Sequence, residues 1–120
     1  MIVVDTSVWA SHFHKKITHL NERLANDEVL QHPFVTGEIA MGNLAARTST
    51  IRFLASIDPA PVGSDSHILE FVEINYLGGT GIGFVDAHLL ASVALAKCKL
   101  WTNDKRLSAQ AERLGLSYQT

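Results

Sequence analysis

The sequence lacks several features that would set it apart from ordinary globular proteins. It holds one cysteine, Cys98, in 120 residues, so it forms no internal disulfide and no cysteine-based zinc site. Ten Lys and Arg stand against twelve Asp and Glu, a formal net charge of −2, which argues against binding nucleic acid by bulk positive charge. No basic stretch precedes an apolar run at the start, and the most apolar segment, 84–96, is too short to span a bilayer. We therefore expect a cytoplasmic protein with no membrane anchor.

Length and composition indicate a single domain over residues 1–120. The chain is 47% hydrophobic and 18% charged, which is enough apolar content to bury a core and too much for a disordered segment. We find no internal repeat, no low-complexity tract and no linker that would divide the chain.

Short apolar runs alternate with helical patterns along the chain. Strands are predicted at 2–4, 28–31, 60–62, 99–102 and 117–119. Helices are predicted from about residue 7 past Phe13, and at 17–25, 33–47, 49–57, 66–76, 84–97 and 104–114. Gly78 to Gly83 forms a connector that fails the dinucleotide-binding spacing, because position 84 is Phe. The alternation predicts an α/β fold with a parallel sheet covered by helices on both faces.

Two acids follow predicted strands directly. Asp5 comes after the run 2–4, and Asp104 comes after the run 99–102. The carboxyl ends of parallel strands share one edge of the sheet, where ligands bind, so the two carboxylates meet there if their strands are neighbours. A structural alternative stays open for each: Asp5 forms only an Asx turn, and Asp104 or Asn103 only caps the last helix.

Two further acids lie within apolar helical patterns. Glu38 has Phe34, Val35, Met41 and Gly42 at helical spacing, which places it on an apolar or close-packed face. Asp86 has Leu89 and Leu90 in the same relation, and neither acid has a basic residue four positions away. A buried unpaired charge is costly, so each acid needs a partner. The alternatives are that Asp86 only favours the dipole of its helix and that Glu38 reaches solvent.

Four clustered carboxylates would repel one another and would therefore favour a cation. Two carboxylates about 4 Å apart repel each other by about 4 kcal/mol at an effective dielectric near 20. Oxygen ligands suit Mg²⁺ or Mn²⁺ better than Zn²⁺, and such ions commonly serve phosphoryl chemistry. Outside these acids the chain is mildly basic, and the candidates for contact with a phosphate backbone are Lys15, Lys16, Arg47, Arg52, Lys105 and Arg106.

These acids lie in motifs that resemble those of a known family. The segments occur in the order Val3-Val4-Asp5-Thr6-Ser7, His32-Pro33-Phe34, Gly37-Glu38, Gly83-Phe84-Val85-Asp86-Ala87-His88 and Leu100-Trp101-Thr102-Asn103-Asp104-Lys105-Arg106-Leu107. Together they resemble the motif set of PIN-domain nucleases, and within these the chain is similar to the VapC-type toxins of bacterial toxin–antitoxin modules. The resemblance runs from residue 2 to about residue 118.

The resemblance implies a three-layer α/β/α sandwich with a five-stranded parallel sheet and an endoribonuclease that depends on Mg²⁺ or Mn²⁺. By position it implies an acidic metal site of Asp5, Glu38, Asp86 and Asp104, with Asp5 and Asp86 as direct ligands of the main ion. It also implies polar support from Ser7 and Thr102, a homodimer, and an antitoxin whose tail covers the acidic groove. Next to Asp104, Lys105 and Arg106 are the leading candidates for contact with the RNA backbone.

Two other readings of the sequence remain open. A small-molecule Mg²⁺-dependent phosphohydrolase would use the same acids in a narrow pocket. A partner-binding module with a vestigial site is disfavoured because all four acids are present. Ser7 has no identifiable histidine base and is expected to be a cap and not a nucleophile. Trp9 and Trp101 are expected in the core, His88 is expected to be packed or on the surface, and the RNA target is left undetermined.

Overall fold

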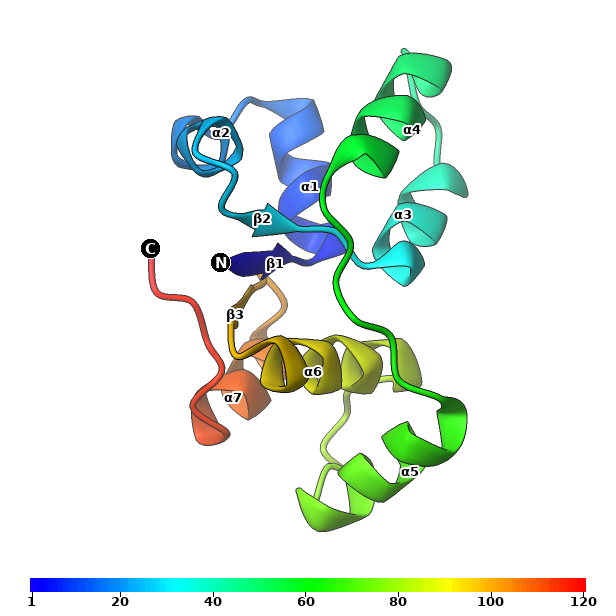
Figure 1. The fold of residues 1–120 in the computed structure, drawn as a ribbon, viewed down its shortest axis with the longest axis vertical. Helices are drawn as coiled ribbons and strands as arrows, with labels where there is room; N and C mark the ends of the chain where they lie inside the picture. The colour runs from blue at the N-terminus through cyan, green and yellow to red at the C-terminus, as the bar shows by residue number, and fades with distance from the viewer.

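A computed structural model describes all 120 residues and has an α/β fold. Three parallel strands, β1 (Ile2–Val4), β2 (Val29–Leu30) and β3 (Lys99–Trp101), form one sheet in the order β2-β1-β3. β1 is central and pairs in parallel with both neighbours (Figure 1). The carboxyl ends of β1 and β3 are therefore adjacent, which brings the residues that follow them together.

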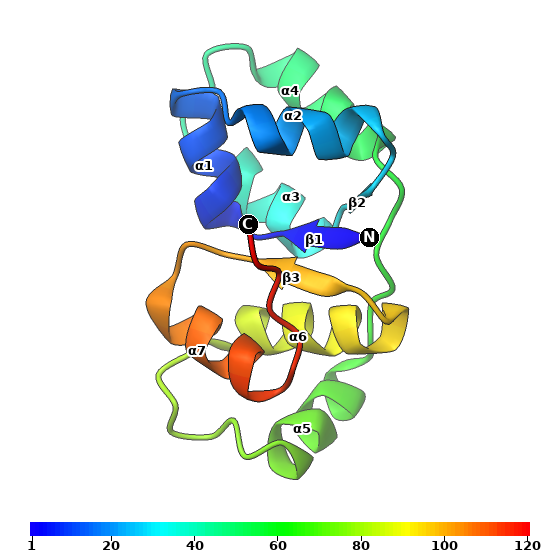
Figure 2. The ribbon, with the colours of Figure 1, turned by 90° about the vertical axis from the view of Figure 1, so that its left-hand side faces the viewer.

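Seven helices lie on two sides of this sheet (Figures 1 and 2). The first group is α1 (Thr6–His14), α2 (Thr18–Ala25), α3 (Pro33–Ala40) and α4 (Arg47–Ser56). The second group is α5 (Asp65–Ile74), α6 (Phe84–Ala96) and α7 (Lys105–Arg113). No helix has the combination of length and apolar character that crossing a membrane requires.

One cluster of 23 buried hydrophobic residues forms the core. Strand β1 is buried along its whole length, and α6 buries a continuous run, 87–93, because its sequence is apolar on all sides. The predicted burial of α6, Trp9 and Trp101 is confirmed. Ser64 is the N-cap of α5, and its hydroxyl accepts a 3.2 Å hydrogen bond from the backbone N–H of His67.

The sheet has three strands and not five. Each of the two outer segments makes only one isolated bridge, Gln31 with Pro59 and Leu100 with Ser117. Pro59 and Pro61 have no N–H to donate to a ladder, which explains why the segment after α4 does not become a strand. At the other edge, the segment after Gly115 is held by two backbone hydrogen bonds to Leu100 and then ends.

The helix predicted over 33–47 is wrong in its extent, since α3 ends at Ala40 and Arg47 begins α4. Gly42 and Asn43 have low helix propensity and interrupt the apolar spacing between the two helices. The guanidinium of Arg47 donates to the carbonyls of Ala40 and Gly42, so it satisfies the end of α3. In this structure Arg47, a candidate for contact with a phosphate backbone, instead stabilises the end of α3.

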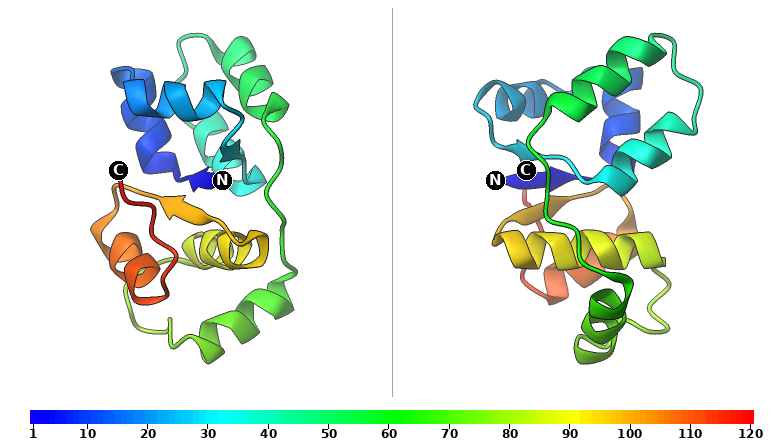
Figure 3. Two further views of the ribbon diagram at one scale, coloured as in Figure 1. Left: turned by 60° about the vertical axis from the view of Figure 1, so that its left-hand side comes forward. Right: turned by 45° about the vertical axis from the view of Figure 1, so that its right-hand side comes forward.

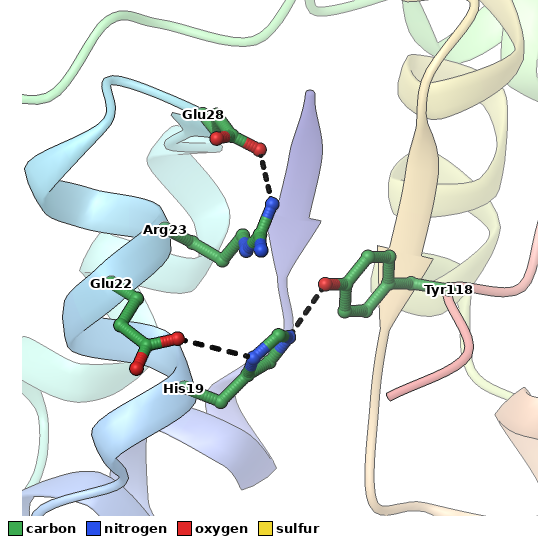
Figure 4. Close-up of polar contacts among 5 residues, drawn as sticks. All are labelled: His19, Glu22, Arg23, Glu28 and Tyr118. Atoms are coloured by element: carbon green, nitrogen blue, oxygen red, sulfur yellow. Dashed lines mark hydrogen bonds and ion pairs between the residues drawn. The ribbon is translucent and has the colours of Figure 1, made fainter.

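The end of the chain is fastened across the sheet to α2. The hydroxyl of Tyr118 lies 2.6 Å from Nε2 of His19, whose Nδ1 is 3.9 Å from the carboxylate of Glu22 (Figure 4). Beside them, Arg23 donates a 2.6 Å hydrogen bond to Glu28 (Figure 4). This polar cluster joins the C-terminal segment and β3 to the first group of helices.

Candidate metal and catalytic site

The carboxylate of Asp5 lies at the carboxyl end of β1 and is nearly buried, with 6% of the residue exposed. Its Oδ2 accepts two hydrogen bonds, at 2.8 Å from the hydroxyl of Ser7 and at 2.7 Å from that of Thr102. Asp5 precedes α1 but makes no side-chain capping bond, so the alternative of an Asx turn is wrong. The Oδ1 atom has no hydrogen-bond donor and is free to bind a ligand.

The two hydroxyls are themselves oriented by the backbone that follows β3. The N–H of Asn103 donates to Oγ of Ser7, and the N–H of Asp104 donates to Oγ1 of Thr102, both at 3.0 Å. Each hydroxyl therefore accepts from the backbone and turns its single proton toward Asp5. Ser7 is thus neither a helix cap nor a nucleophile in this structure. The network ties the end of β1 to the turn between β3 and α7.

Asp104 caps α7, as the structural alternative predicted. Its Oδ1 accepts from the backbone N–H of Arg106 at 2.9 Å and of Leu107 at 3.1 Å. The residue is exposed, and its Oδ2 has no donor. Capping through one oxygen fixes the carboxylate and leaves the other oxygen available at the edge of the sheet.

Asp86 lies in the first turn of α6 and is half-buried. Its Oδ2 accepts a 3.0 Å hydrogen bond from the N–H of Gly83. Burial raises the pKa of the Asp86 carboxyl, the Gly83 hydrogen bond partly offsets the rise, and repulsion from Asp5, Asp104 and Glu38 adds to it. Asp5, Asp104 and Glu38 therefore lie close enough to disfavour the charge of Asp86, although the four acids come from four separate segments of the chain.

Glu38 is exposed, so its predicted position on an apolar or close-packed face is wrong. Its neighbours Phe34 and Met41 are also exposed, at 37% and 88%, because α3 is short and its outer side is uncovered. The hydroxyl of Thr6 donates a 2.8 Å hydrogen bond to Oε1 of Glu38. Thr6 and Ser7 directly follow Asp5, so two adjacent hydroxyls contact two of the four acids, Glu38 and Asp5.

An open groove of about 600 Å³ begins at Thr6 and Glu38 and continues between α1, α3 and α4. Its apolar lining comes from Ala10, Phe13, Ile39, Leu44, Ala45 and Ala46. Of the four acids, only Glu38 lines this groove, and Asp5, Asp86 and Asp104 are not part of its lining.

The donor set suits a hard divalent cation. All candidate ligands are carboxylate oxygens, and no Lys or Arg lies within ion-pair distance of any of the four acids. In the positions that the structure gives them, no three His, Cys, Asp or Glu side chains are close enough to hold one metal ion together. One or two of these carboxylates together with water molecules would be the ligands that suit Mg²⁺.

His88 lies outside the acidic cluster. Of the two positions expected for it, packed or on the surface, the structure shows the packed one. It is 1% exposed, between the rings of Phe34 and Phe84, with centroids 4.7 and 4.9 Å away. Figure 3 shows how the beginnings of α3 and α6 approach each other there. Beneath them, His32 caps α3 through a 3.0 Å bond from the N–H of Phe34, and burial, together with His88, lowers the pKa of His32 to about 4.

Three contacts at the site were not predicted from the sequence. Thr6 bonds to Glu38, Gly83 bonds to Asp86, and the side chain of Arg106 lies against Gly81. Only the bond within the first turn of α6 has a local signal, since an acid at the third helical position commonly bonds back to the residue before the helix. The other two join segments that are distant in the sequence.

The chain is similar to known proteins both in sequence and in fold. The chain is 42% identical over 118 residues, or 98% of its length and 95% of the relative's, to Ribonuclease VapC32 of two Mycobacterium tuberculosis strains. The crystal structure of PAE2754 from Pyrobaculum aerophilum matches with a TM-score of 0.62 at 16% identity, over 92% of this chain and 79% of that one. The second match shows a shared fold. No protein-family model matches the chain.

Proposed function

The chain belongs to the VapC family of PIN-domain ribonucleases, and from this premise we propose that it is an endoribonuclease that depends on Mg²⁺ or Mn²⁺ and acts as the toxin of a toxin–antitoxin pair. One observation carries the metal dependence. The pKa of Asp86 is raised first by burial and then by the charges of Asp5, Asp104 and Glu38, and no Lys or Arg pairs with any of the four carboxylates. A divalent cation is the partner that such a cluster favours.

Each acid has a proposed role in the site. Asp5 and Asp86 are the direct ligands of the main ion, since Asp5 is buried, Asp86 is half-buried, and each keeps one oxygen without a donor. Glu38 and Asp104 complete the site through water or a second ion, because they lie at its exposed rim. We treat residues 1–120 as a single nuclease domain.

The chain's own residues orient this chemistry. Ser7 and Thr102 hold Oδ2 of Asp5, so that Oδ1 faces away from the network. Thr6 restrains the otherwise mobile side chain of Glu38. The bound ion would supply a more acidic water and would neutralise charge that develops on the phosphodiester. Lys105 and Arg106, both exposed in the first turn of α7, contact the RNA backbone in this proposal.

The partners follow from the same surface. An antitoxin tail with apolar side chains and a terminal cation would match the groove between α1, α3 and α4, which is apolar along its length and acidic at Glu38. The proposal includes a homodimer and a cytoplasmic location, both of which the family resemblance favours.

Cleavage of a labelled single-stranded RNA by the purified protein tests the proposed function. We expect cleavage with Mg²⁺ or Mn²⁺, none with chelator, and none by Asp5→Asn, with Asp58→Asn, an exposed acid outside the site, as the matched control. A chromogenic phosphate monoester should remain intact. Turnover of the monoester without RNA cleavage would instead establish a small-molecule phosphohydrolase.

Expression in bacteria without an antitoxin tests the toxin role separately. The parent protein should arrest growth, and Asp86→Ala, expressed at the same soluble level, should not. Normal growth on strong expression of a parent protein that cleaves RNA in vitro would retain the nuclease and reject the toxin role.

A further inference from the structure

Gly81 lies under the side chain of Arg106. The backbone of Gly81 has φ +89°, and a Cβ built there would stand 3.0 Å from Cδ of Arg106 and 3.3 Å from its Nη1. The conformation favours glycine because L side chains rarely adopt it, and an added Cβ would also require the flexible end of the Arg106 side chain to shift slightly. The loop before α6 and the first turn of α7 are therefore packed together through this pair.

The guanidinium of Arg106 has no partner in the chain. It forms no ion pair and no hydrogen bond within the chain, while the backbone N–H of the residue donates to Asp104. An arginine near four carboxylates would be expected to pair with one of them, because such pairs are among the strongest in proteins. Contact with Gly81 directs the side chain along the loop instead, and its five N–H donors stay free.

Both ends of this contact are attached to the acidic cluster. Arg106 is two residues after Asp104 and donates its backbone N–H to that carboxylate at 2.9 Å. Gly81 is two residues before Gly83, whose N–H donates to Asp86 at 3.0 Å. A cation without a partner thus lies between the two segments that carry Asp104 and Asp86.

We propose that Arg106, seated on Gly81, binds one phosphate of the RNA backbone and places the neighbouring phosphodiester at the carboxylates. The inference rests on the proposed ribonuclease function and deepens it, since it assigns the positioning of the substrate to one of two adjacent cations. A guanidinium matches a phosphate by two parallel N–H bonds, which a lysine ammonium does not provide. The neighbouring Lys105 has no such seat and adds only attraction through its charge.

Steady-state cleavage of a single-stranded RNA by three variants tests the assignment. Arg106→Ala and Arg106→Lys should each lower kcat/KM by about tenfold or more, because the lysine keeps the charge but loses the paired bonds. Lys105→Ala removes the same charge from an adjacent exposed position and should lower kcat/KM by less than about threefold, mainly through KM at low salt. Equal losses in Lys105→Ala and Arg106→Ala, or full activity in Arg106→Lys, would show that charge alone matters.

Gly81→Ala tests the seat itself. The added methyl requires the end of the Arg106 side chain to shift, so kcat/KM should fall in the parent background, by less than in Arg106→Ala, with little further effect when Arg106 is already Ala. If the effects of Gly81→Ala and Arg106→Ala on kcat/KM are independent, the contact between the two residues does not position Arg106. Gly79→Ala is the matched control, since Gly79 also has positive φ, at +76°, yet nothing lies within 4 Å of an added Cβ. Strain alone would make the two glycine variants equally defective.

Metal-free binding of the same RNA separates this proposal from the proposed function. Arg106→Ala should bind the RNA more weakly than the parent in the presence of chelator, whether or not the site cleaves. Unchanged RNA binding and unchanged cleavage in Arg106→Ala would reject the role of Arg106 while the ribonuclease function stands. A parent protein that never cleaves RNA under any divalent ion would reject the ribonuclease function instead.

Discussion

The hydroxyl of Thr102 donates a 2.7 Å hydrogen bond to Oδ2 of Asp5, although 97 positions separate the two residues in the sequence. The same hydroxyl accepts the N–H of Asp104 at 3.0 Å. One side chain thus orients one proposed metal ligand and anchors the backbone of another. The parallel pairing of β1 with β3 makes this possible, because it places the residues after Val4 and Trp101 side by side.

Thr102→Val should weaken the site without unfolding the protein. Valine keeps the shape of threonine but removes one donor to Asp5 and leaves the N–H of Asp104 without its acceptor, a loss worth about 1–3 kcal/mol. We expect cleavage to fall about tenfold or more and the Mg²⁺ concentration for half-maximal activity to rise. A Mg²⁺ titration of the cleavage rate measures both, and Thr48→Val, an exposed threonine in α4, is the control. Parent-like Mg²⁺ dependence in Thr102→Val would show that Asp5 does not need this donor.

Asp86→Asn should raise the stability of the metal-free protein at neutral pH and abolish its response to Mg²⁺. The pKa of Asp86 is raised above the value of 3.8 that it has when unfolded, first by burial and then by the three other carboxylates. The folded state therefore binds its proton more tightly than the unfolded state, so stability is lost as the pH rises from 3.8 through the raised pKa. The asparagine has no charge to lose and can still accept the N–H of Gly83.

Thermal melts with chelator and with Mn²⁺ check this expectation. With chelator at pH 7, Asp86→Asn should melt at a higher temperature than the parent, and the difference should vanish below about pH 3.8. With Mn²⁺ the parent should gain stability and the variant should not. Glu70→Gln, an exposed acid on α5, should change neither melt. A variant that gains as much from Mn²⁺ as the parent would remove Asp86 from the proposed ligands.

The parts of the fold that the sequence predicted are those with a strong local cause. The apolar run before Asp5 could only be a buried strand, and the helix at 84–96 is apolar on every side. Asp104 caps α7 because its side chain reaches the first free N–H groups after it. These features depend on a few neighbouring residues, and the structure agrees with the sequence at each.

The parts of the fold that the sequence did not predict depend on which other segments of the chain pack against them. The apolar spacing over 33–47 predicts one helix with an apolar face. It does not show that Gly42 and Asn43 interrupt that helix, or that the outer side of α3 is uncovered. Glu38 is therefore exposed with a partner, Thr6, that no pattern within α3 reveals. The two outer strands that the sequence predicts, at 60–62 and 117–119, do not form for a similar reason. Whether an extended segment completes a ladder depends on the length and the hydrogen-bond donors of the neighbouring segment.

Tyr118→Phe should destabilise the protein and leave cleavage intact. The change removes the 2.6 Å hydrogen bond to His19 but keeps the ring that packs on Trp101, with centroids 5.6 Å apart. One hydrogen bond of this kind contributes about 1 kcal/mol, and no acid of the site is part of the cluster. Urea unfolding should show the loss, and kcat/KM should stay within about twofold of the parent. Tyr76→Phe, which alters an 81% exposed tyrosine, is the control. A large loss of cleavage would mean that the C-terminal segment contributes to the site.

The stability of the protein should fall as the pH decreases from about 6.5 to about 4 because of His32. Its pKa is about 4 in the folded state against an ordinary value of 6.5, since burial and then the neighbouring His88 disfavour the charged form. In this interval the unfolded state carries a proton that the folded state does not, so stability rises with pH and the full benefit is present above 6.5. The change is about 1.4 kcal/mol per pH unit, or roughly 2 kcal/mol between pH 6.5 and pH 5.

Replacement of His32 by asparagine isolates this contribution. Asparagine is a good N-cap for α3 and does not titrate, so His32→Asn should lose stability at neutral pH through its smaller volume yet depend less on pH below 6.5. Urea unfolding of both proteins at pH 7, 6 and 5 gives the two slopes. His67→Gln, which removes an exposed histidine on α5, should keep the parent's slope. The lowered pKa of His12, caused by burial and by Lys16, acts equally in all three proteins, so the difference in slope belongs to His32. Equal slopes in the parent and in His32→Asn would mean that the buried ring accepts a proton as readily in the folded chain as in the unfolded one.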